Sequence, residues 1–384
     1  MDADLVTHIV LWLLGFVFFF RLPVCHKKQA KSITRPTVSI IVPARNEESN
    51  IPNLMRSLKG QIKVDDEIII VDDHSEDNTA AVAELIGARV IKSSEMPRGW
   101  TGKTWACYQG ARKAAGNVLV FLDADTFIEE DGLDTILSNY IENDGVLSIQ
   151  PYHKMHKLYE QFSAFFNLVL MAAMGSFTVF GKMIQPIGLF GPVIVMEKKL
   201  YLQSGGFEKV KGEILEDLAI GAEFKKQGVK IHCYGGRGTA SFCMYPGGIS
   251  QLVTGWSKGF AMGASKTSIP VLIMIIAWIT GAIGATRNLL QTVIITDSSM
   301  LALWGVLYVV YAVQIYWMLY RIGDFKSYVA LLFPIFLLFF LAVFAYSFII
   351  IFMRKNISWK GRTIKLRRRG EDADPSSDRH YHND

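Results

Sequence analysis

Apolar residues in this chain gather into four long stretches around a middle part of ordinary composition, and this uneven distribution constrains the fold more than any other feature. One stretch covers residues 5–20, and three more follow at 269–285, 301–320 and 328–353. The middle part, about 240 residues long, has the mixed pattern of a soluble domain. The 384-residue chain is therefore expected to hold one globular domain between membrane segments.

The first apolar stretch is interpreted as an uncleaved membrane anchor over residues 1–24. Asp2 and Asp4 precede the stretch, whereas basic residues follow it from Arg21 to Lys31. A secretory signal would carry its basic residues first and end at a small-residue cleavage site. Basic residues after the anchor place the following domain in the cytoplasm. The alternative is a buried core helix, because the run is slightly shorter than the ~20 residues that cross a bilayer.

The three later stretches, taken as membrane segments over residues 268–353, raise a problem of topology. If the N-terminus is outside and all four stretches cross, the tail at 354–384 must also lie outside. The first part of that tail is strongly basic, which favours the cytoplasmic side, and the remainder is polar. One stretch of this multi-pass cell-membrane protein is therefore expected to be interfacial or re-entrant. The weakest candidate to cross is 269–285, because glycines and Arg287 interrupt it.

Short β-branched runs alternate with helical periodicity along the middle domain, residues 36–265. The pattern predicts strands at 37–43, 67–72, 89–92 and 118–122 and helices at 47–58, 79–86, 104–115 and 218–226. Strands that alternate with helices form an open, mostly parallel Rossmann-like sheet, whose ligands bind beyond the carboxyl ends of the strands. The sequence thus predicts an α/β fold with its site at that edge.

Polar residues follow three of these strands at the point where each strand ends. They are Arg45 and Glu47 after the first strand, Asp72 and Asp73 after the second, and Asp123 and Asp125 after the fourth. A single carboxylate at a strand end can simply cap the next helix, but three such groups at one edge favour a binding site. Mg²⁺ and Mn²⁺ commonly take one or two carboxylates together with substrate phosphate oxygens. Asp123 and Asp125 are therefore the predicted metal ligands.

Neither a dinucleotide fingerprint nor a P-loop is present in the sequence. The charge of a bound diphosphate would then be met by the metal and by basic side chains. Lys103, in GWTGKTWACYQG, is the best candidate; the alternative is a solvated lysine at a helix start.

Further along, Glu216 and Asp217 precede a predicted helix. One of them could be a general base for an acceptor hydroxyl, or both could only stabilise the helix N-terminus.

Composition excludes several other functions. The four cysteines have no C-x-x-C spacing, which supports neither a zinc site nor a disulfide framework and agrees with a reduced compartment. The net charge of +5 comes largely from the tail. Basic residues beside membrane segments suit anionic headgroups, and no nucleic-acid motif is visible.

The apolar stretch at 162–180 is either a core helix or a segment that lies against the bilayer and admits a lipid tail.

SIIVPARNEE, IIIVDDHSEDNT, the strand-ending DAD, ILED and the Q...GW element occur in the order and spacing of family 2 glycosyltransferases with a GT-A fold. The resemblance covers roughly residues 36–260. It implies that Pro43, Arg45, Glu47 and Asp73 line the nucleotide pocket, that Asp123 and Asp125 bind the diphosphate and the metal, and that Asp217 is the catalytic base. The candidate site residues also include Asp72 and Lys103 for the nucleotide-sugar, Glu216 beside the base, and Gln251 and Trp256 for contact with donor or acceptor.

Longer stretches narrow the resemblance within this family. GWTGKTWACYQG and LFGPVIVMEKKLYLQSGGF resemble bacterial carotenoid-acid glycosyltransferases of the 4,4'-diaponeurosporenoate type, and GWTGK with ISWKGR resembles hopene-associated glycosyltransferases. The resemblance implies an inverting, metal-dependent transfer of a hexose, glucose first, from a UDP-sugar to a carotenoid acid or another terpenoid. It also implies the membrane, its lipids and other carotenoid-pathway enzymes as partners.

Other functions remain open at this stage. The acceptor could instead be diacylglycerol, a ceramide-like lipid or a polyprenyl phosphate. QLVTGW stands where processive synthases carry Q-x-x-R-W, and the missing arginine favours single transfer over polymerisation. A non-catalytic membrane scaffold is disfavoured because all the expected carboxylates are present. A transporter is disfavoured because the apolar segments are few and none carries a buried charge pair.

Overall fold

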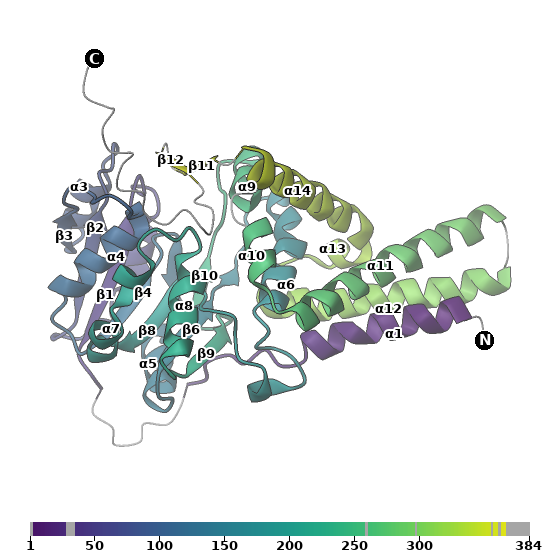
Figure 1. Ribbon diagram of the computed structural model, residues 1–384, viewed down its shortest axis with the longest axis horizontal. Helices are drawn as coiled ribbons and strands as arrows, with labels where there is room; N and C mark the ends of the chain where they lie inside the picture. The colour runs from purple at the N-terminus through teal and green to yellow at the C-terminus, as the bar shows by residue number, and fades with distance from the viewer. Residues whose placement is uncertain are drawn as a thin grey trace, which may run out of the picture.

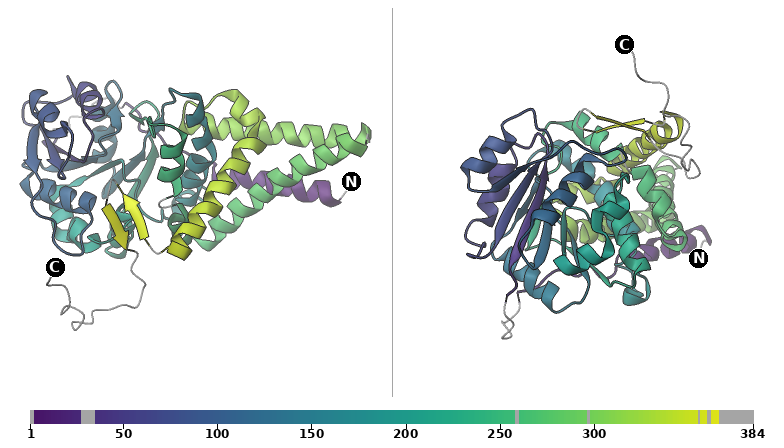
Figure 2. Two further views of the ribbon diagram at one scale, coloured as in Figure 1. Left: turned by 90° about the horizontal axis from the view of Figure 1, so that it is seen from above. Right: turned by 60° about the vertical axis from the view of Figure 1, so that its left-hand side comes forward.

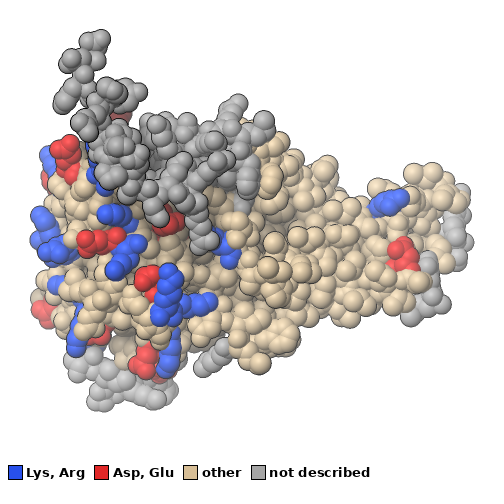
Figure 3. Space-filling view, viewed as in Figure 1, with Lys and Arg blue, Asp and Glu red and all other residues tan. Residues whose placement is uncertain are grey.

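The computed structural model describes residues 3–27, 35–257, 260–295, 298–354, 356–359 and 362–365. An α/β part lies at one end of the molecule, and an elongated helical part extends from it at the other (Figure 1). Lys, Arg, Asp and Glu gather on the α/β part, whereas the visible face of the helical part is almost free of charge (Figure 3). The apolar stretches of the sequence thus form the helical part, and the stretch of mixed composition forms the α/β part.

A seven-stranded sheet forms the centre of the α/β part, in the order β3-β2-β1-β4-β8-β6-β9. The parallel strands are β1 (Val38–Ala44), β2 (Glu67–Asp72), β3 (Arg89–Lys92), β4 (Val118–Leu122), β6 (Val146–Gln150) and β9 (Ile231–Gly235), and the antiparallel strand is β8 (Val193–Glu197). The mostly parallel α/β sheet predicted from the sequence is confirmed.

Helices cover both faces of this sheet because alternate strand residues point to opposite sides. Val38, Ile40 and Val42 belong to one buried core, and Ile41 belongs to the other. The first core contains α2 (Ile51–Leu58), α3 (Thr79–Leu85) and α5 (Gly132–Ile141), and the second contains α4 (Gly102–Lys113), α7 (Lys198–Ser204), η3 (Gly206–Val210) and α8 (Glu216–Lys226). The central strands β1, β4, β8 and β6 are therefore buried on two sides.

Local capping moves several element boundaries from their predicted positions. The helix predicted at 47–58 begins only at Ile51, because the N–H groups of Asn50 and Ile51 close a turn on the Glu47 carbonyl at 2.9 and 3.0 Å. The helix predicted at 104–115 begins at Gly102, directly after the capping residue Thr101. The helix predicted from residue 218 starts at Glu216, so both carboxylates of the ILED motif lie in its first turn.

A small sheet continues from the end of β4 toward the helical part. It consists of β5 (Thr126–Ile128), β10 (Ala240–Phe242) and β7 (Tyr152–His153), in that order. Two 3-10 helices, η1 (Leu158–Ser163) and η2 (Gly181–Met183), flank α6 (Ala164–Ala173), and α9 (Ile249–Ser257) and α10 (Phe260–Lys266) follow the small sheet. These elements occupy the space between the main sheet and the long helices (Figure 1).

Three long helices lie side by side in the helical part: α1 (Ala3–Phe18), α11 (Ile269–Ile295) and α12 (Ser298–Ile322) (Figures 1 and 2). In the described residues, two helices are long and apolar enough to cross a membrane. They are α11, with a mean hydropathy of 2.1, and the portion Met300–Ile322 of α12, with 1.6. The predicted anchor forms a helix, but α1 has only 16 residues.

The stretch at 269–285 was expected to be the weakest candidate to cross, and this ranking is wrong. It belongs to α11, which continues through Arg287 to Ile295 and has the highest mean hydropathy of the candidate spans. Its glycines serve close packing instead of breaking the helix. A Cβ atom at Gly281 would overlap Leu11 and Tyr311, and a Cβ atom at Gly284 would overlap His8 of α1.

The last apolar stretch, expected as one segment at 328–353, is two helices. They are α13 (Ser327–Leu331) and α14 (Phe333–Arg354), with Pro334 in the first turn of α14. Proline is tolerated at such a position because its missing N–H would have no helical partner there. The hairpin β11 (Asn356–Trp359) and β12 (Arg362–Lys365) follows. The tail after residue 365, including its arginines at 367–369, lies outside the described residues.

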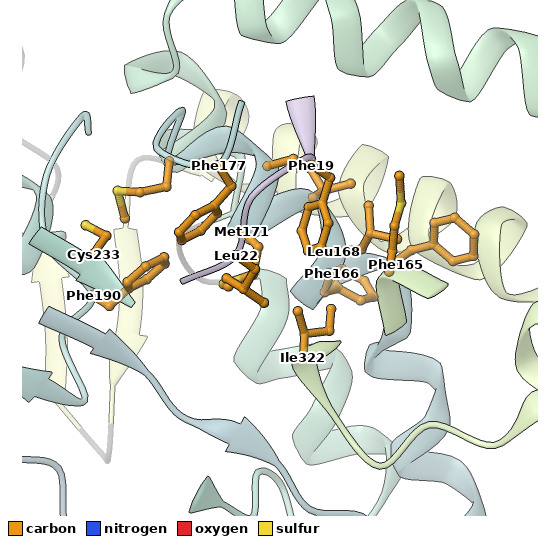
Figure 4. Close-up of a cluster of buried hydrophobic side chains, with 14 of the residues drawn as sticks. Phe19, Leu22, Phe165, Phe166, Leu168, Met171, Phe177, Phe190, Cys233 and Ile322 are labelled. Atoms are coloured by element: carbon orange, nitrogen blue, oxygen red, sulfur yellow. The ribbon is translucent and has the colours of Figure 1, made fainter. Parts of the chain in front are cut away.

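One continuous apolar core joins the sheet to the helical part. Figure 4 shows Phe19 and Leu22, after α1, facing the side chains of α6 and Ile322 of α12. Farther toward the sheet, Phe177 stacks on Phe190 with ring centroids 6.1 Å apart and an interplanar angle of 6°. The core-helix interpretation of 162–180 therefore holds for α6, whose side chains are mostly buried.

Candidate functional site

A cavity of about 790 Å³ opens beyond the carboxyl ends of β1, β2 and β4. Nearly all the residues selected from the sequence line it: Pro43, Arg45, Glu47, Asp73, Lys103, Asp123, Asp125, Glu216, Asp217, Gln251 and Trp256. They come from six separate parts of the sequence, and the parallel topology brings them together. Asp72 is the exception. Its carboxylate accepts a hydrogen bond from the Ser75 N–H at 3.2 Å, which orders the turn after β2.

The DAD motif is the tight connection between β4 and β5. The Asp123 N–H donates to the Pro192 carbonyl at 3.0 Å, and the Thr126 N–H donates back to the Asp123 carbonyl at 3.0 Å. Ala124 is buried, whereas Asp123 and Asp125 are half-buried and line the cavity. Backbone bonds therefore hold the two carboxylates at the cavity wall.

Lys103 lies in the cavity wall as a counter-ion and is not a solvated surface lysine. Its ammonium nitrogen is 2.8 Å from an Asp123 carboxylate oxygen and 3.1 Å from a Glu216 oxygen. Burial alone would lower the pKa of Lys103, but the carboxylates of Asp123 and Glu216 hold it well above its usual value. A permanent positive charge therefore links the DAD motif to the start of α8.

Asp217 is a carboxyl group of the cavity wall whose pKa is raised. Its Oδ2 accepts a hydrogen bond from the Gly191 N–H at 3.1 Å, and its Oδ1 accepts one from the Leu218 N–H at 2.9 Å. Burial raises the pKa of Asp217 to about 7, and the adjacent Glu216 carboxylate adds to the rise. A carboxylate with a pKa near neutrality is suited to accept a proton from a substrate hydroxyl.

Three glycines position Asp217, and the sequence analysis missed their role. A Cβ atom at Gly221 of α8 would lie 2.6 Å from the Gly188 backbone, and one at Gly188 would lie 2.5 Å from the Leu218 Cα. A Cβ atom at Gly191 would lie 3.0 Å from the Asp217 carboxylate. The helix and the loop before β8 can therefore approach backbone to backbone. Only the spacing of small residues in GLFGP and LAIGAE could have indicated this crossing.

Arg45 connects the ends of β1 and β2 within the polar part of the cavity. It is 9% exposed, and its guanidinium donates to the Asp73 carbonyl at 2.9 Å and to Glu76 at 3.4 Å. Glu47 accepts a hydrogen bond from the Asn50 amide at 2.6 Å. These contacts fix the two strand ends side by side and leave a polar recess between them.

The Q...GW element forms part of the cavity wall. Trp256 is buried, donates its indole N–H to Ser163 at 3.1 Å and stacks on Phe166 at a centroid distance of 5.0 Å. It is therefore not an anchor at a membrane surface. The side-chain Oε1 of Gln251 accepts a hydrogen bond from the Gly247 N–H at 2.7 Å. Tyr245, which the sequence analysis did not single out, fills the space beside Gly255, where any Cβ atom would overlap its ring.

The cavity continues from this polar end into an apolar arm. The arm is lined by Val169, Leu170 and Ala173 of α6 and Met174 directly after it, by Phe260, Gly263 and Ala264 of α10, and by Leu272 and Ile275 of α11. None of these side chains carries a charge. One cavity therefore connects a group of carboxylates at the sheet to a helix that is apolar enough to cross a membrane.

Metal binding at this site would need ligands from a substrate. In the described ranges, no group of three or more His, Cys, Asp and Glu side chains is arranged to hold a metal ion. Asp123 and Asp125 supply two carboxylates one residue apart. This set agrees with Mg²⁺ or Mn²⁺ chemistry, in which phosphate oxygens of a bound nucleotide complete the coordination.

Comparison of the sequence with known protein families and proteins identifies the family to which this chain belongs. The family model for Glycosyl transferase family 2 matches residues 39–182, and the model for Glycosyl transferase family group 2 matches residues 118–349. The 4,4'-diaponeurosporenoate glycosyltransferase of Staphylococcus aureus (strain bovine RF122 / ET3-1) is 33% identical over 348 residues, which cover 89% of this chain and 92% of that protein. The chain belongs to glycosyltransferase family 2.

Further relatives agree with this assignment. The 4,4'-diaponeurosporenoate glycosyltransferase of Staphylococcus haemolyticus (strain JCSC1435) is 33% identical over 346 residues, covering 88% of the chain and 92% of that protein. Among solved structures, a mannosyltransferase from Pyrobaculum calidifontis in complex with GDP-Man and Mn²⁺ superposes with a TM-score of 0.53 at 14% identity, covering 90% of the glycosyltransferase and 96% of that chain. The glycosyltransferase therefore has the GT-A fold that the motifs implied.

Proposed function

We propose that this glycosyltransferase transfers a hexose, with glucose as the first candidate, from a UDP-sugar to a carotenoid acid or another terpenoid in the membrane. The observation that carries the proposal is the single cavity with two chemically different ends. Its polar end offers carboxylates and a lysine for a nucleotide-sugar. Its apolar arm suits a long hydrocarbon chain.

The relatives support the choice of acceptor. The two staphylococcal proteins are named for a carotenoid acid, and each covers nearly nine tenths of this chain. A carotenoid is a stiff apolar chain whose reacting group lies at its end. Such a molecule could place its chain in the arm between α6, α10 and α11 and its end group beside Asp217, since all of these line one cavity.

The reaction proposed is a single displacement that inverts the sugar. An acceptor oxygen forms a bond to the anomeric carbon while the bond from that carbon to the diphosphate breaks, and UDP departs with the bonding electrons. A bound Mg²⁺ or Mn²⁺ at Asp123 and Asp125 would stabilise the negative charge that develops on the leaving diphosphate. Lys103 lies beside Asp123 and adds a second positive charge there.

Asp217 would receive the acceptor proton when the acceptor is an alcohol. Its carboxylate lies in the cavity with a pKa near neutrality, held by hydrogen bonds from Gly191 and Leu218. A carotenoid carboxylate is already ionised and brings no proton to remove. Asp217 would then act only through its charge and its hydrogen bonds, so its importance depends on the acceptor.

The proposal is tested with membranes that contain the full chain and radiolabelled UDP-glucose. Label is followed into the organic-extractable fraction, with Mn²⁺ or with a chelator, for the wild type, Asp125→Ala and the control Asp144→Ala. The Asp144 side chain is 94% exposed and does not line the cavity. We expect labelled lipid from the wild type and the control, and its loss with the chelator and with Asp125→Ala.

The chemical identity of the labelled lipid separates the acceptor classes. A carotenoid absorption spectrum supports the terpenoid acceptor, whereas label in a glycerolipid, ceramide-like or polyprenyl-phosphate fraction supports the alternative acceptor class. If no common nucleotide-sugar labels any lipid while carotenoid and glycerolipid acceptors are both supplied, the protein is a non-catalytic scaffold and the proposal is wrong.

A further inference from the structure

The helix pair α13 and α14 contacts, at its start and again at Ser347, the elements that connect the main sheet to the long helices. Just before α13, the Lys326 N–H donates to the Gln161 side chain of η1 at 2.9 Å. Near the end of α14, the Ser347 hydroxyl donates to the Ser257 carbonyl at the end of α9 at 2.6 Å. A chain segment that crossed a bilayer would carry its second end about 30 Å away from its first. This segment returns to the domain from which it started.

The turn between the two helices lies deep along the long helices. The Tyr308 hydroxyl of α12 donates to the Leu331 carbonyl at 2.6 Å, and the Tyr308 ring lies 4.9 Å from the Phe333 ring between centroids. Tyr308 precedes the end of α12 at Ile322 by 14 residues (322 − 308), which corresponds to about 20 Å of helix. The turn therefore reaches well into the layer that α12 crosses and does not lie at its edge.

The described surface of this helix pair, up to Ile349, carries no charged side chain. No Asp, Glu, Lys or Arg occurs from Ser327 to Met353. Around the turn, Leu331, Ile335 and Leu338 are 57%, 56% and 68% exposed. Exposed leucine and isoleucine side chains on neighbouring turns are stable in hydrocarbon and costly in water. The helix α11, the most apolar of the candidate spans, also exposes isoleucine side chains.

The opposite side of α14 packs against the wall of the cavity. Phe340 lies 5.0 Å from Phe166 of α6 and 5.5 Å from Phe260 of α10 between ring centroids. Phe336 lies 4.9 Å from Phe162 of η1. Figure 1 shows α14 crossing back over α6 toward α9, whereas α11 and α12 extend away from the α/β part. The buried side of α14 between Phe336 and Phe340 therefore packs against η1, α6 and α10, which lie between the main sheet and the long helices.

From these contacts we infer that α13 and α14 form a re-entrant hairpin, which enters the bilayer from the side of the catalytic domain, turns at Leu332 and leaves on the same side. The lipid bilayer is the partner of its exposed face. The hairpin replaces the fourth crossing that the sequence suggested. With α1, α11 and α12 as three crossings, the basic tail lies on the same side as the catalytic domain, which removes the conflict between its charge and its position.

The side of the tail is tested on the full chain with a C-terminal epitope tag. Sealed vesicles of both orientations are treated with a protease, and cleavage of the tag is compared with cleavage within the catalytic domain. We expect the tag and the domain to be cut in the same vesicles. A tag that is protected wherever the domain is cut would show that α14 crosses the bilayer, and the hairpin would be wrong.

The depth of the hairpin is tested independently with spin labels at Leu332, Leu338 and Ile349, each introduced as cysteine in a chain whose four native cysteines are replaced with alanine. All three side chains are at least 45% exposed. A hairpin predicts the greatest depth at Leu332 and a steady decrease toward Ile349, over about 25 Å of helix. A crossing helix predicts the greatest depth near Leu338, at the middle of the apolar run.

Labels at Ile276 and Ile294 of α11 provide a matched control in the same vesicles. These side chains are 54% and 81% exposed and lie on the same face of the helix, about 27 Å apart along it. A helix that crosses should place one label near each side of the hydrocarbon. If Leu338 proves deeper than Leu332 while the control behaves as a crossing helix, the inference fails.

Discussion

At the residue scale, the site depends on charges held in a partly buried group. Lys103 links Asp123 to Glu216, and Asp217 lies next to Glu216 in the first turn of α8. The carboxylates of Glu216 and Asp123 disfavour ionisation of Asp217, and the ammonium group of Lys103 favours it. Among these groups Asp217 has its pKa raised to about 7, mainly by burial. It is therefore the carboxylate best suited to exchange a proton during a reaction.

The replacement Asp217→Asn should affect two acceptor classes differently. Transfer to a hydroxyl acceptor should fall by about 10²–10⁴-fold, the usual contribution of a general base. Transfer to a carboxylate acceptor should fall only in part, because no proton has to be removed. Rates of transfer to one lipid of each kind provide the measurement. Equal losses on both acceptors would show that Asp217 is not a base.

The pH dependence of the wild type provides the control for this interpretation. Because burial raises the pKa of Asp217 to about 7, the carboxylate is protonated as the pH falls through that value. Transfer to a hydroxyl acceptor should then decline about tenfold per pH unit. A bound divalent ion favours the ionised form and moves the decline to lower pH. The residual rate of Asp217→Asn should lack this decline.

At the element scale, the position of α8 depends on its close approach to the loop before β8. The crossing has Gly221 on one side and Gly188 on the other, and it places Asp217 within 3.1 Å of the Gly191 N–H. The alternation of strands and helices in the sequence predicts both elements but not their distance. That distance depends on the absence of side chains at the crossing.

Gly221→Ala should separate α8 from the loop and displace Asp217. A Cβ atom there would lie 2.6 Å from the Gly188 backbone, which cannot move aside as a flexible side chain can. We expect the transfer rate to fall at least tenfold and the protein to lose about 1–3 kcal/mol of stability. Rate and thermal unfolding are measured beside Gly305→Ala, whose Cβ would have open space. An unchanged transfer rate would contradict the positioning role.

At the scale of the whole molecule, the cavity belongs to both parts of the fold. Its polar end is built from strand ends, and its arm is built from α6, α10 and α11. The same α6 contributes to the apolar core that joins the sheet to the long helices (Figure 4). Separating the two parts would therefore remove a wall of the site as well as the two helices that are long and apolar enough to cross a membrane.

A charge placed in the arm should separate acceptor turnover from donor binding. Leu170 is half-buried and lines the arm, so Leu170→Lys places an ammonium group where an apolar chain would lie. Transfer to a membrane lipid should fall at least tenfold, while binding of UDP should change little. Val179→Lys, at a 41% exposed position outside the cavity, is the control. A larger loss of UDP binding than of turnover would contradict the acceptor arm.

Periodicity and residue type were sufficient to predict the elements that surround the site. The predicted β2, β3 and β4 agree with the structure residue for residue, because β-branched runs that end in polar residues specify buried parallel strands. The carboxylates at the ends of these strands also converge as expected, since parallel strands present their carboxyl ends at one edge. Asp72 differs because its carboxylate orders a turn, a local contact that residue type alone does not reveal.

The arrangement of the helices in the helical part was less predictable from the sequence, for a physical reason. Hydropathy identifies each apolar stretch, but it does not show which faces are covered by protein and which by lipid. The tertiary structure made α11 a long helix by placing its glycines against α1, and it divided the last stretch near Pro334. The sequence by itself determined the α/β fold, the family and the chemistry of the strand ends. Only tertiary contacts decided how the apolar helices are arranged, because packing between apolar surfaces leaves no periodic signature of its own.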